Sequence, residues 1–166
     1  AVKAAFSGRT RVNGLAAALF PQAVRAGRGN LQWDLAAGGT WEKPIPSGSF
    51  ELSEAGIDLP TLGIRLEDMS LKGGFREDQL RIDSLVLRSG SGTLNGQATL
   101  RLQDRRIAAL QGRLTGRNFQ FVNRPGLRAI GNPDLEFSGP PERIRLSGKI
   151  EIPEALISGG SVQGVK

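Results

Sequence analysis

Residues 92–102 read GTLNGQATLRL and alternate strictly between small or apolar side chains and polar ones. Alternate residues of a β-strand point to opposite faces of its sheet, so this stretch predicts a strand with one dry and one wet face. Residues 144–152, which read IRLSGKIEI, repeat the pattern. Each stretch keeps five positions on its dry face; they are Leu94, Gly96, Ala98, Leu100 and Leu102 in the first and Ile144, Leu146, Gly148, Ile150 and Ile152 in the second.

A related phrase, in which a glycine opens an alternating strand that ends at a proline, recurs every 40 to 60 residues or so. One copy runs from Gly29 to Pro44, and another runs from residue 146 to Pro153. Repeated strand phrases are typical of elongated sheets, in which each repeat contacts its neighbours, and not of a closed enzyme fold. We therefore expect an all-β chain whose function lies along a surface.

The alternation changes phase between Leu66 and Met69, and again between Ile82 and Leu85. A one-residue phase change is what a β-bulge produces, so the sheet is expected to be strongly twisted or curved. Residues 43–48 are predicted to be a connection and residues 123–132 a loose, proline-bearing segment. A strand is predicted near residues 2–6, and one short helix at residues 15–24.

The composition excludes several classes of function. The 166 residues include no cysteine and no histidine, so thiolate nucleophiles, disulfides and the usual zinc ligands are absent. The adjacent carboxylates at 67–68 and 77–78 would point to opposite faces of a strand, which does not suit paired acid and base catalysis. We expect no enzyme activity, no cofactor and no metal site.

The net charge of +6 is concentrated in residues 101–166, which carry 11 basic and 6 acidic side chains. Many of these arginines alternate with apolar residues and so fit the wet face of a strand. No aromatic residues are interleaved with them for base stacking, so we expect no nucleic-acid partner; attraction to anionic lipid headgroups is another use of the same charge.

Small residues occupy part of the dry rows, at Gly96, Ala98 and Gly148. They have two interpretations, which the sequence alone leaves open. Either neighbouring side chains pack tightly over them, or they leave room for another molecule.

The phrases named above, together with residues 56–68, residues 89–96 and the run from Pro133 to Ile157, resemble the conserved C-terminal region of the TamB family. The resemblance covers most of residues 27–158. It implies an elongated, curved β-taco, which is a folded-over sheet with a hydrophobic concave groove. It also implies a periplasmic protein that is anchored in the inner membrane of a diderm bacterium, and a single β-taco fragment, residues 1–166, of a longer repetitive protein.

Two functions remain open on this resemblance. The first is a hydrophobic conduit that carries phospholipid or other acyl chains between the inner and outer membranes, each buried CH₂ contributing about 0.8 kcal/mol. The second is an outer-membrane protein assembly module, active on autotransporters, that docks strands with a TamA-like partner of the Omp85 type. An open apolar trough also predicts self-association of the fragment.

The residues predicted to line the groove share an apolar or small side chain on an expected dry face. They are Leu31, Trp33, Leu35, Phe50, Leu52, Ile64, Leu66, Leu94, Ala98, Leu100, Leu102, Ile144, Leu146, Ile150 and Ile152.

Overall fold

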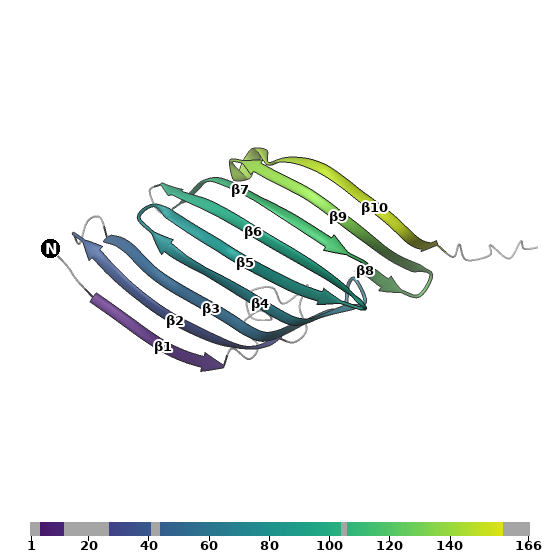
Figure 1. Cartoon of the computed structure of the whole chain (residues 1–166), viewed down its shortest axis with the longest axis horizontal. Coiled ribbons are helices and arrows are strands. Elements are labelled where there is room, and N and C mark those ends of the chain that lie inside the picture. Colours follow the sequence, from purple (N-terminus) through teal and green to yellow (C-terminus); the bar gives the residue numbers. More distant parts are fainter. Residues whose placement is uncertain (1–3, 12–26, 41–43, 104–105, 158–166) are drawn as a thin grey trace, which may run out of the picture.

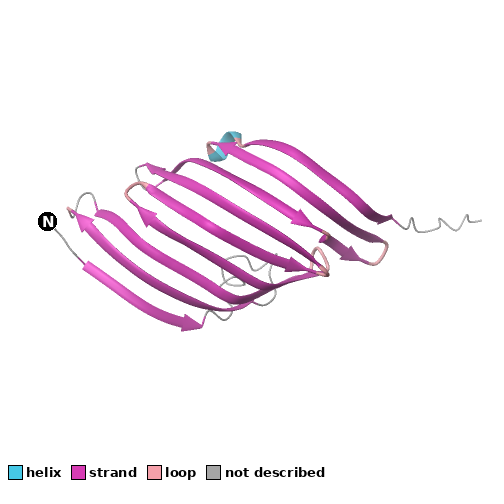
Figure 2. Cartoon of the chain, in the orientation of Figure 1, coloured by secondary structure: helices cyan, strands magenta, loops and turns pink. Residues whose placement is uncertain are grey.

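The computed structural model describes residues 4–11, 27–40, 44–103 and 106–157. They form one open, curled antiparallel sheet of ten strands (Figure 1). The strands are β1 Ala4–Arg11, β2 Gly27–Gly39, β3 Pro44–Leu59, β4 Ile64–Arg76, β5 Gln79–Ser89, β6 Gly92–Gln103, β7 Arg106–Arg117, β8 Phe119–Arg124, β9 Leu127–Gly139 and β10 Arg145–Ile157. A single 3-10 turn, η1 Pro141–Arg143, joins the last two strands (Figure 2). The expected all-β, curved sheet is confirmed.

Neighbouring strands follow one another in chain order, so nearly every connection is a short hairpin. The exception is β8, which pairs with β9 alone. Strand β9 pairs with β7 from Gly139 to Asp134 and with β8 from Gly131 to Leu127. The chain from β7 through β8 and back along β9 is therefore one long hairpin, whose tip extends beyond β6 (Figure 1).

Bulges occur where the alternation changes phase, as predicted. The register of β4 against β5 shifts between Glu67 and Ser70, and that of β5 against β6 shifts between Ile82 and Leu85. Asp68 lies inside the first shift with a φ of 47°, in the left-handed region. Bulges increase local twist, which is how a sheet with few bulky residues curls.

Pro44 and Pro153 do not end strands, and this part of the prediction was wrong, although Pro60, Pro125 and Pro140 do follow the last residues of β3, β8 and β9. Residues 44–48, predicted to be a connection, begin β3, in which Pro44 pairs with Gly39 and Pro46 with Ala37. A proline is tolerated at the first residue of a strand and at bulges. Pro153 lies at such an irregularity, between Glu151 and Glu154, and β10 continues past it to Ile157.

Residues 123–132 are also more regular than expected. Strand β8 ends at Arg124 and β9 begins at Leu127, so Pro125 and Gly126 alone connect them. The tight hairpin of β8 with β9 and the pairing of β9 with β10, which is distant in sequence, supply this order. The helix predicted at residues 15–24 lies outside the described residues, as do residues 2 and 3 of the first predicted strand.

Several of the most buried side chains lie where the tip of the long hairpin meets the turns of its neighbours. The buried apolar residues of the described chain are Ala55, Ile64, Phe119 and Ile130. Ser89, only 1% exposed, donates a hydrogen bond from Oγ to the Gln120 carbonyl of β8 at 2.8 Å. The Asn123 amide donates to the Leu62 carbonyl of the β3–β4 turn at 2.9 Å. The hairpin tip is therefore fixed to two turns of the sheet.

Candidate functional site

Cross-strand pairing assembles apolar side chains into rows that cross the whole sheet. In the first row, which we call the aromatic row, each residue pairs with the next on the neighbouring strand. The row is Gly8, Trp33, Phe50, Gly73, Ile82, Ala98, Gly112, Phe137 and Leu146, from β1 to β10. Directly paired residues of an antiparallel sheet share a face, so this row is continuous on one side.

A second row, the leucine row, lies beside the aromatic row on the same face, two residues away on each strand except β5, where the bulge makes the separation three residues. It is Thr10, Leu31, Leu52, Leu71, Leu85, Gly96, Leu114, Leu135 and Gly148. A third row lies on the other side of the aromatic row. It is Phe6, Leu35, Gly48, Phe75, Leu80, Leu100, Leu110 and Gly139. The face that carries these three rows is called the apolar face below.

Large side chains cover three glycines of the apolar face, Gly73, Gly96 and Gly112. The ring of Phe50 would stand 2.8 Å from a Cβ added to Gly73, and that of Phe137 would clash with one on Gly112. Leu114 Cδ2 would stand 2.7 Å from a Cβ on Gly96. Tight cross-strand packing, one of the two interpretations left open by the sequence, therefore accounts for Gly96. The rows have no gap at these positions.

Exposure along the rows depends on position in the sheet. Side chains in the middle strands, such as Leu85 and Leu114, are half-buried. At the two sheet edges the same rows are open: Phe6 of β1 is 64% exposed and Leu146 of β10 is 65% exposed. A monomer rarely leaves a contiguous apolar surface of this extent without a partner or ligand. The sheet has a single layer, so in the described chain no second layer covers the apolar face.

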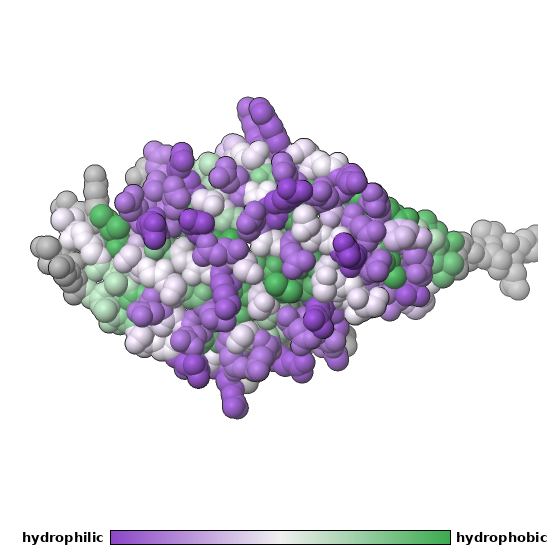
Figure 3. Space-filling model, in the orientation of Figure 1, coloured by the Kyte–Doolittle hydropathy of each residue, from purple (hydrophilic) through white to green (hydrophobic). Residues whose placement is uncertain are grey.

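The opposite, polar face carries ion pairs between neighbouring strands. Arg113 of β7 contacts Asp134 of β9 at 2.9 Å, and Lys72 of β4 contacts Glu51 of β3 at 3.1 Å. These groups remain largely exposed, so each pair contributes little to stability and mainly keeps the face wet. Figure 3 shows the molecule in the same orientation as Figure 1, with hydrophilic residues over much of this view and hydrophobic ones gathered beside the grey C-terminal trace.

Most residues predicted to line a groove lie on the apolar face. Trp33, Phe50, Ala98 and Leu146 belong to the aromatic row, Leu31 and Leu52 to the leucine row, and Leu35 and Leu100 to the third row. The remaining paired members are Ile64 with Leu59, Leu66 with Ile57, Leu94 with Leu87, Leu102 with Ile107 and Ile150 with Pro133. Their contact with a ligand stays a prediction.

Two predicted residues have no cross-strand partner. Ile144 precedes β10 and is 50% exposed, and Ile152 lies in the register shift of β10 and is 60% exposed. The sequence reasoning also omitted apolar-face residues on the middle strands, although the same alternation could have found them. They are Leu71, Phe75, Leu80, Ile82, Leu85, Leu87, Leu110, Leu114, Leu135 and Phe137.

The described residues offer no cluster of acidic side chains that could hold a metal ion. The same part of the chain contains no helix long and apolar enough to cross a membrane. The most distinctive feature of the described sheet is its apolar face, which no second layer of the described residues covers.

A family model, the TamB C-terminal domain, matches residues 81–164. The chain belongs to the TamB family. The match begins in β5 and includes β6 to β10. Strands β2, β3 and β4, which continue the same rows, lie outside the matched residues. No curated protein and no solved structure matches the chain.

Membership of the TamB family supports a role in outer-membrane assembly or lipid transport in the envelope of a diderm bacterium. The family is a transport or assembly module and is not a known enzyme family. It also implies association with an outer-membrane partner in general.

Proposed function

We propose that this TamB-family chain is a section of a hydrophobic conduit that carries phospholipid acyl chains across the periplasm. The observation that carries the proposal is the set of three apolar rows that follow the cross-strand pairing, which no second layer covers among the described residues. Each row runs perpendicular to the strands, which is the direction in which further repeats would extend the sheet. An acyl chain can therefore lie along a row and move from strand to strand.

The dimensions support this proposal. Strands lie about 4.8 Å apart, so a row across nine strands is about 38 Å long. The hydrocarbon core of a bilayer is about 30 Å thick, so the acyl chains of one leaflet span about 15 Å. One row can hold two such chains end to end. Because leucine and phenylalanine side chains repeat along it, no single position holds a chain much more strongly than the next.

The proposal places the protein in the periplasm as a single β-taco section of a longer chain anchored in the inner membrane, and gives it no catalytic step. Its test is photocrosslinking with benzoylphenylalanine at Leu52, on the apolar face, and at Glu51, on the polar face of the same strand. We expect phospholipid adducts at Leu52 and none at Glu51. Equal labelling of both positions, or none at either in a folded protein, would reject the conduit.

The alternative function, assembly of outer-membrane proteins, draws on the edge strand β10. All 13 of its residues are exposed, and its outer edge has no partner strand among the described residues. Such an edge can accept a strand from an outer-membrane partner of the Omp85 type by β-augmentation. The chain has no native cysteine, so single cysteines along β10 can be crosslinked to such a partner. Crosslinks that alternate with the strand period would favour this function.

A further inference from the structure

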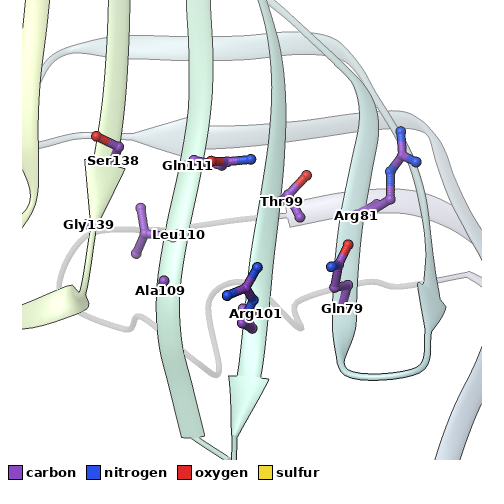
Figure 4. A pocket seen from close by; sticks show the side chains of 9 residues that line it. All are labelled: Gln79, Arg81, Thr99, Arg101, Ala109, Leu110, Gln111, Ser138 and Gly139. Atoms are coloured by element: carbon purple, nitrogen blue, oxygen red, sulfur yellow. The ribbon is translucent and has the colours of Figure 1, made fainter.

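The polar face contains a groove of about 310 Å³ across β5, β6, β7 and β9 (Figure 4). Its lining residues are Gln79, Arg81, Thr99, Arg101, Ala109, Leu110, Gln111, Ser138 and Gly139. We propose that this groove binds a phosphate group, carried by a lipid headgroup or free in solution. The proposal does not depend on the conduit, because the polar side chains of the groove lie on the opposite face of the sheet; Leu110 and Gly139, which also line it, belong to the third row of the apolar face.

Every polar side chain in the groove can donate a hydrogen bond. Arg81 and Arg101 supply guanidinium groups, and the other four polar side chains are amides and hydroxyls. No carboxylate belongs to the described lining. A surface of donors without an acceptor-only group favours an anion with several oxygen atoms.

The register of the sheet brings these donors together from 60 residues of sequence. Arg81 pairs with Thr99, Thr99 with Gln111, and Gln111 with Ser138, so the four form one row on the polar face. In Figure 4, Gln111 extends toward Thr99. Strands lie about 4.8 Å apart, so the row spans about 14 Å.

A second row of groove residues, Gln79, Arg101 and Ala109, leaves space around the Arg101 side chain. Gln79 pairs with Arg101, and Arg101 pairs with Ala109, whose methyl group leaves the guanidinium uncrowded on that side. Figure 4 shows the Arg101 and Gln79 side chains next to each other on β6 and β5. An arginine beside a neutral amide, with room on its other side, can place both arms of its fork on one anion.

An adjacent groove shows what the polar face looks like when its charges are balanced. Its lining includes Asp83, Arg113 and Glu136, and Arg113 contacts Glu136 at 3.7 Å as well as Asp134 at 2.9 Å. Arg81, shared by both grooves, contacts Asp83 at 3.3 Å. Arg101, in contrast, has no ion-pair partner among the described residues. The groove around Arg101 thus contains a guanidinium that no ion pair among the described residues compensates.

Phosphate matches this arrangement better than a carboxylate does. A carboxylate presents two oxygens in one plane, whereas a phosphate presents oxygens in several directions, which donors on neighbouring strands can reach. Bidentate bonds from arginine to phosphate are among the strong charge-assisted hydrogen bonds of proteins. Arg101 is expected to supply the fork, with Thr99 and Gln111 as neutral donors.

The test compares two arginines on the same face. Binding is measured for wild type and for Arg101→Gln, Arg101→Lys and Arg113→Gln, each checked for fold by circular dichroism. The probes are inorganic phosphate, followed by NMR, and sedimented vesicles of phosphatidylglycerol or of a phosphate-free galactolipid. We expect Arg101→Gln to weaken phosphate binding about tenfold, because a charge-assisted hydrogen bond is lost. Arg101→Lys should recover part of it, and Arg113→Gln should change it less than twofold.

Comparison of the two kinds of probe, inorganic phosphate and lipid vesicles, identifies the source of the phosphate. Binding to phosphatidylglycerol vesicles without binding to inorganic phosphate assigns the groove to a lipid headgroup, and binding to both assigns it to the phosphate itself. If Arg101→Gln and Arg113→Gln weaken phosphate binding equally, the binding reflects general charge attraction, and the proposal is overturned. Failure of wild type to bind either probe, or equal binding to galactolipid vesicles, would overturn it as well.

Discussion

Leu114 of β7 lies directly over Gly96 of β6, so that its Cδ2 would stand 2.7 Å from a Cβ added to that glycine. Leu85 of β5 approaches from the other side, at 3.4 Å from the same point. The leucine row therefore continues across a position that has no side chain of its own. The glycine exists because its two neighbours occupy the space.

The first prediction tests this packing. Gly96→Ala should destabilise the fold by about 1–3 kcal/mol, because the added methyl overpacks Leu114. The measurement is urea unfolding followed by circular dichroism. Gly38→Ala is the matched control, because nothing lies within 4 Å of a Cβ at Gly38. There we expect no loss of stability, since alanine restricts the unfolded chain. Similar losses in both variants would contradict the packing argument.

The second prediction concerns the docked hairpin tip. Ser89→Ala removes the hydrogen bond to the Gln120 carbonyl at a site that is 1% exposed. An unsatisfied buried acceptor costs about 1–3 kcal/mol, so the midpoint of urea unfolding should fall. Ser84→Ala, at an exposed position on the same strand, is the control. Hydrogen exchange should also become faster in β8, and unchanged exchange there would argue against docking through Ser89.

The third prediction follows from an ion pair on the edge strand. Lys149 donates a hydrogen bond to Glu151 at 3.0 Å, and this bond, followed by the charge of Glu151, raises the pKa of Lys149 above its ordinary value. The stabilisation is therefore present below the unfolded pKa of the lysine and is lost as the pH rises through the raised folded pKa. An NMR titration of Lys149 should show a lower midpoint in Glu151→Gln than in wild type. Identical midpoints would show that the pair does not persist in solution.

The sequence predicts the faces of the strands because alternation is a local signal. Leu94, Leu100 and Leu102 fall on one face of β6 as expected, and the bulge at Ile82 and Leu85 occurs where the phase changes. Prolines misled the prediction at the strand ends. The pattern predicts that a strand ends at Pro44, but Pro44 is the first residue of β3, a position that needs no ladder donor.

Register explains what the sequence could not provide. The ring of Phe137 packs over Gly112 because the two residues, 25 positions apart in sequence, are paired across β7 and β9. No local sequence pattern encodes that pairing. The same holds for the groove around Arg101, whose donors come from four strands. In the sequence these residues are ordinary polar positions of alternating strands. Their association exists only after the strands pair.

The open edge of β10 has a defined hydrogen-bonding direction. Ile150 pairs with Pro133, and the ring carbons of Pro133 face Gly116 of β7, which places the Pro133 nitrogen on the β7 side. The pairing of β7 with β9 accordingly ends one residue earlier, at Thr115 and Asp134. Two directly opposite residues of an antiparallel pair either bond to each other or both direct their N–H and C=O groups outward. Because the Pro133 nitrogen points toward β7, its partner Ile150 directs its N–H away from β9. The Ile150 N–H therefore faces the open edge.

The last prediction is that the isolated protein self-associates through this edge. Ile150, Ile152 and Leu156 are 47%, 60% and 56% exposed, and a long edge strand with exposed apolar side chains is a template for pairing with another chain. Ile150→Pro removes the outward donor and should shift the protein toward monomer in sedimentation velocity. Ile150→Ala keeps the N–H and should reduce association less. If the two variants associate equally, the apolar face rather than the strand edge holds the copies together. A monomeric wild type would contradict self-association altogether.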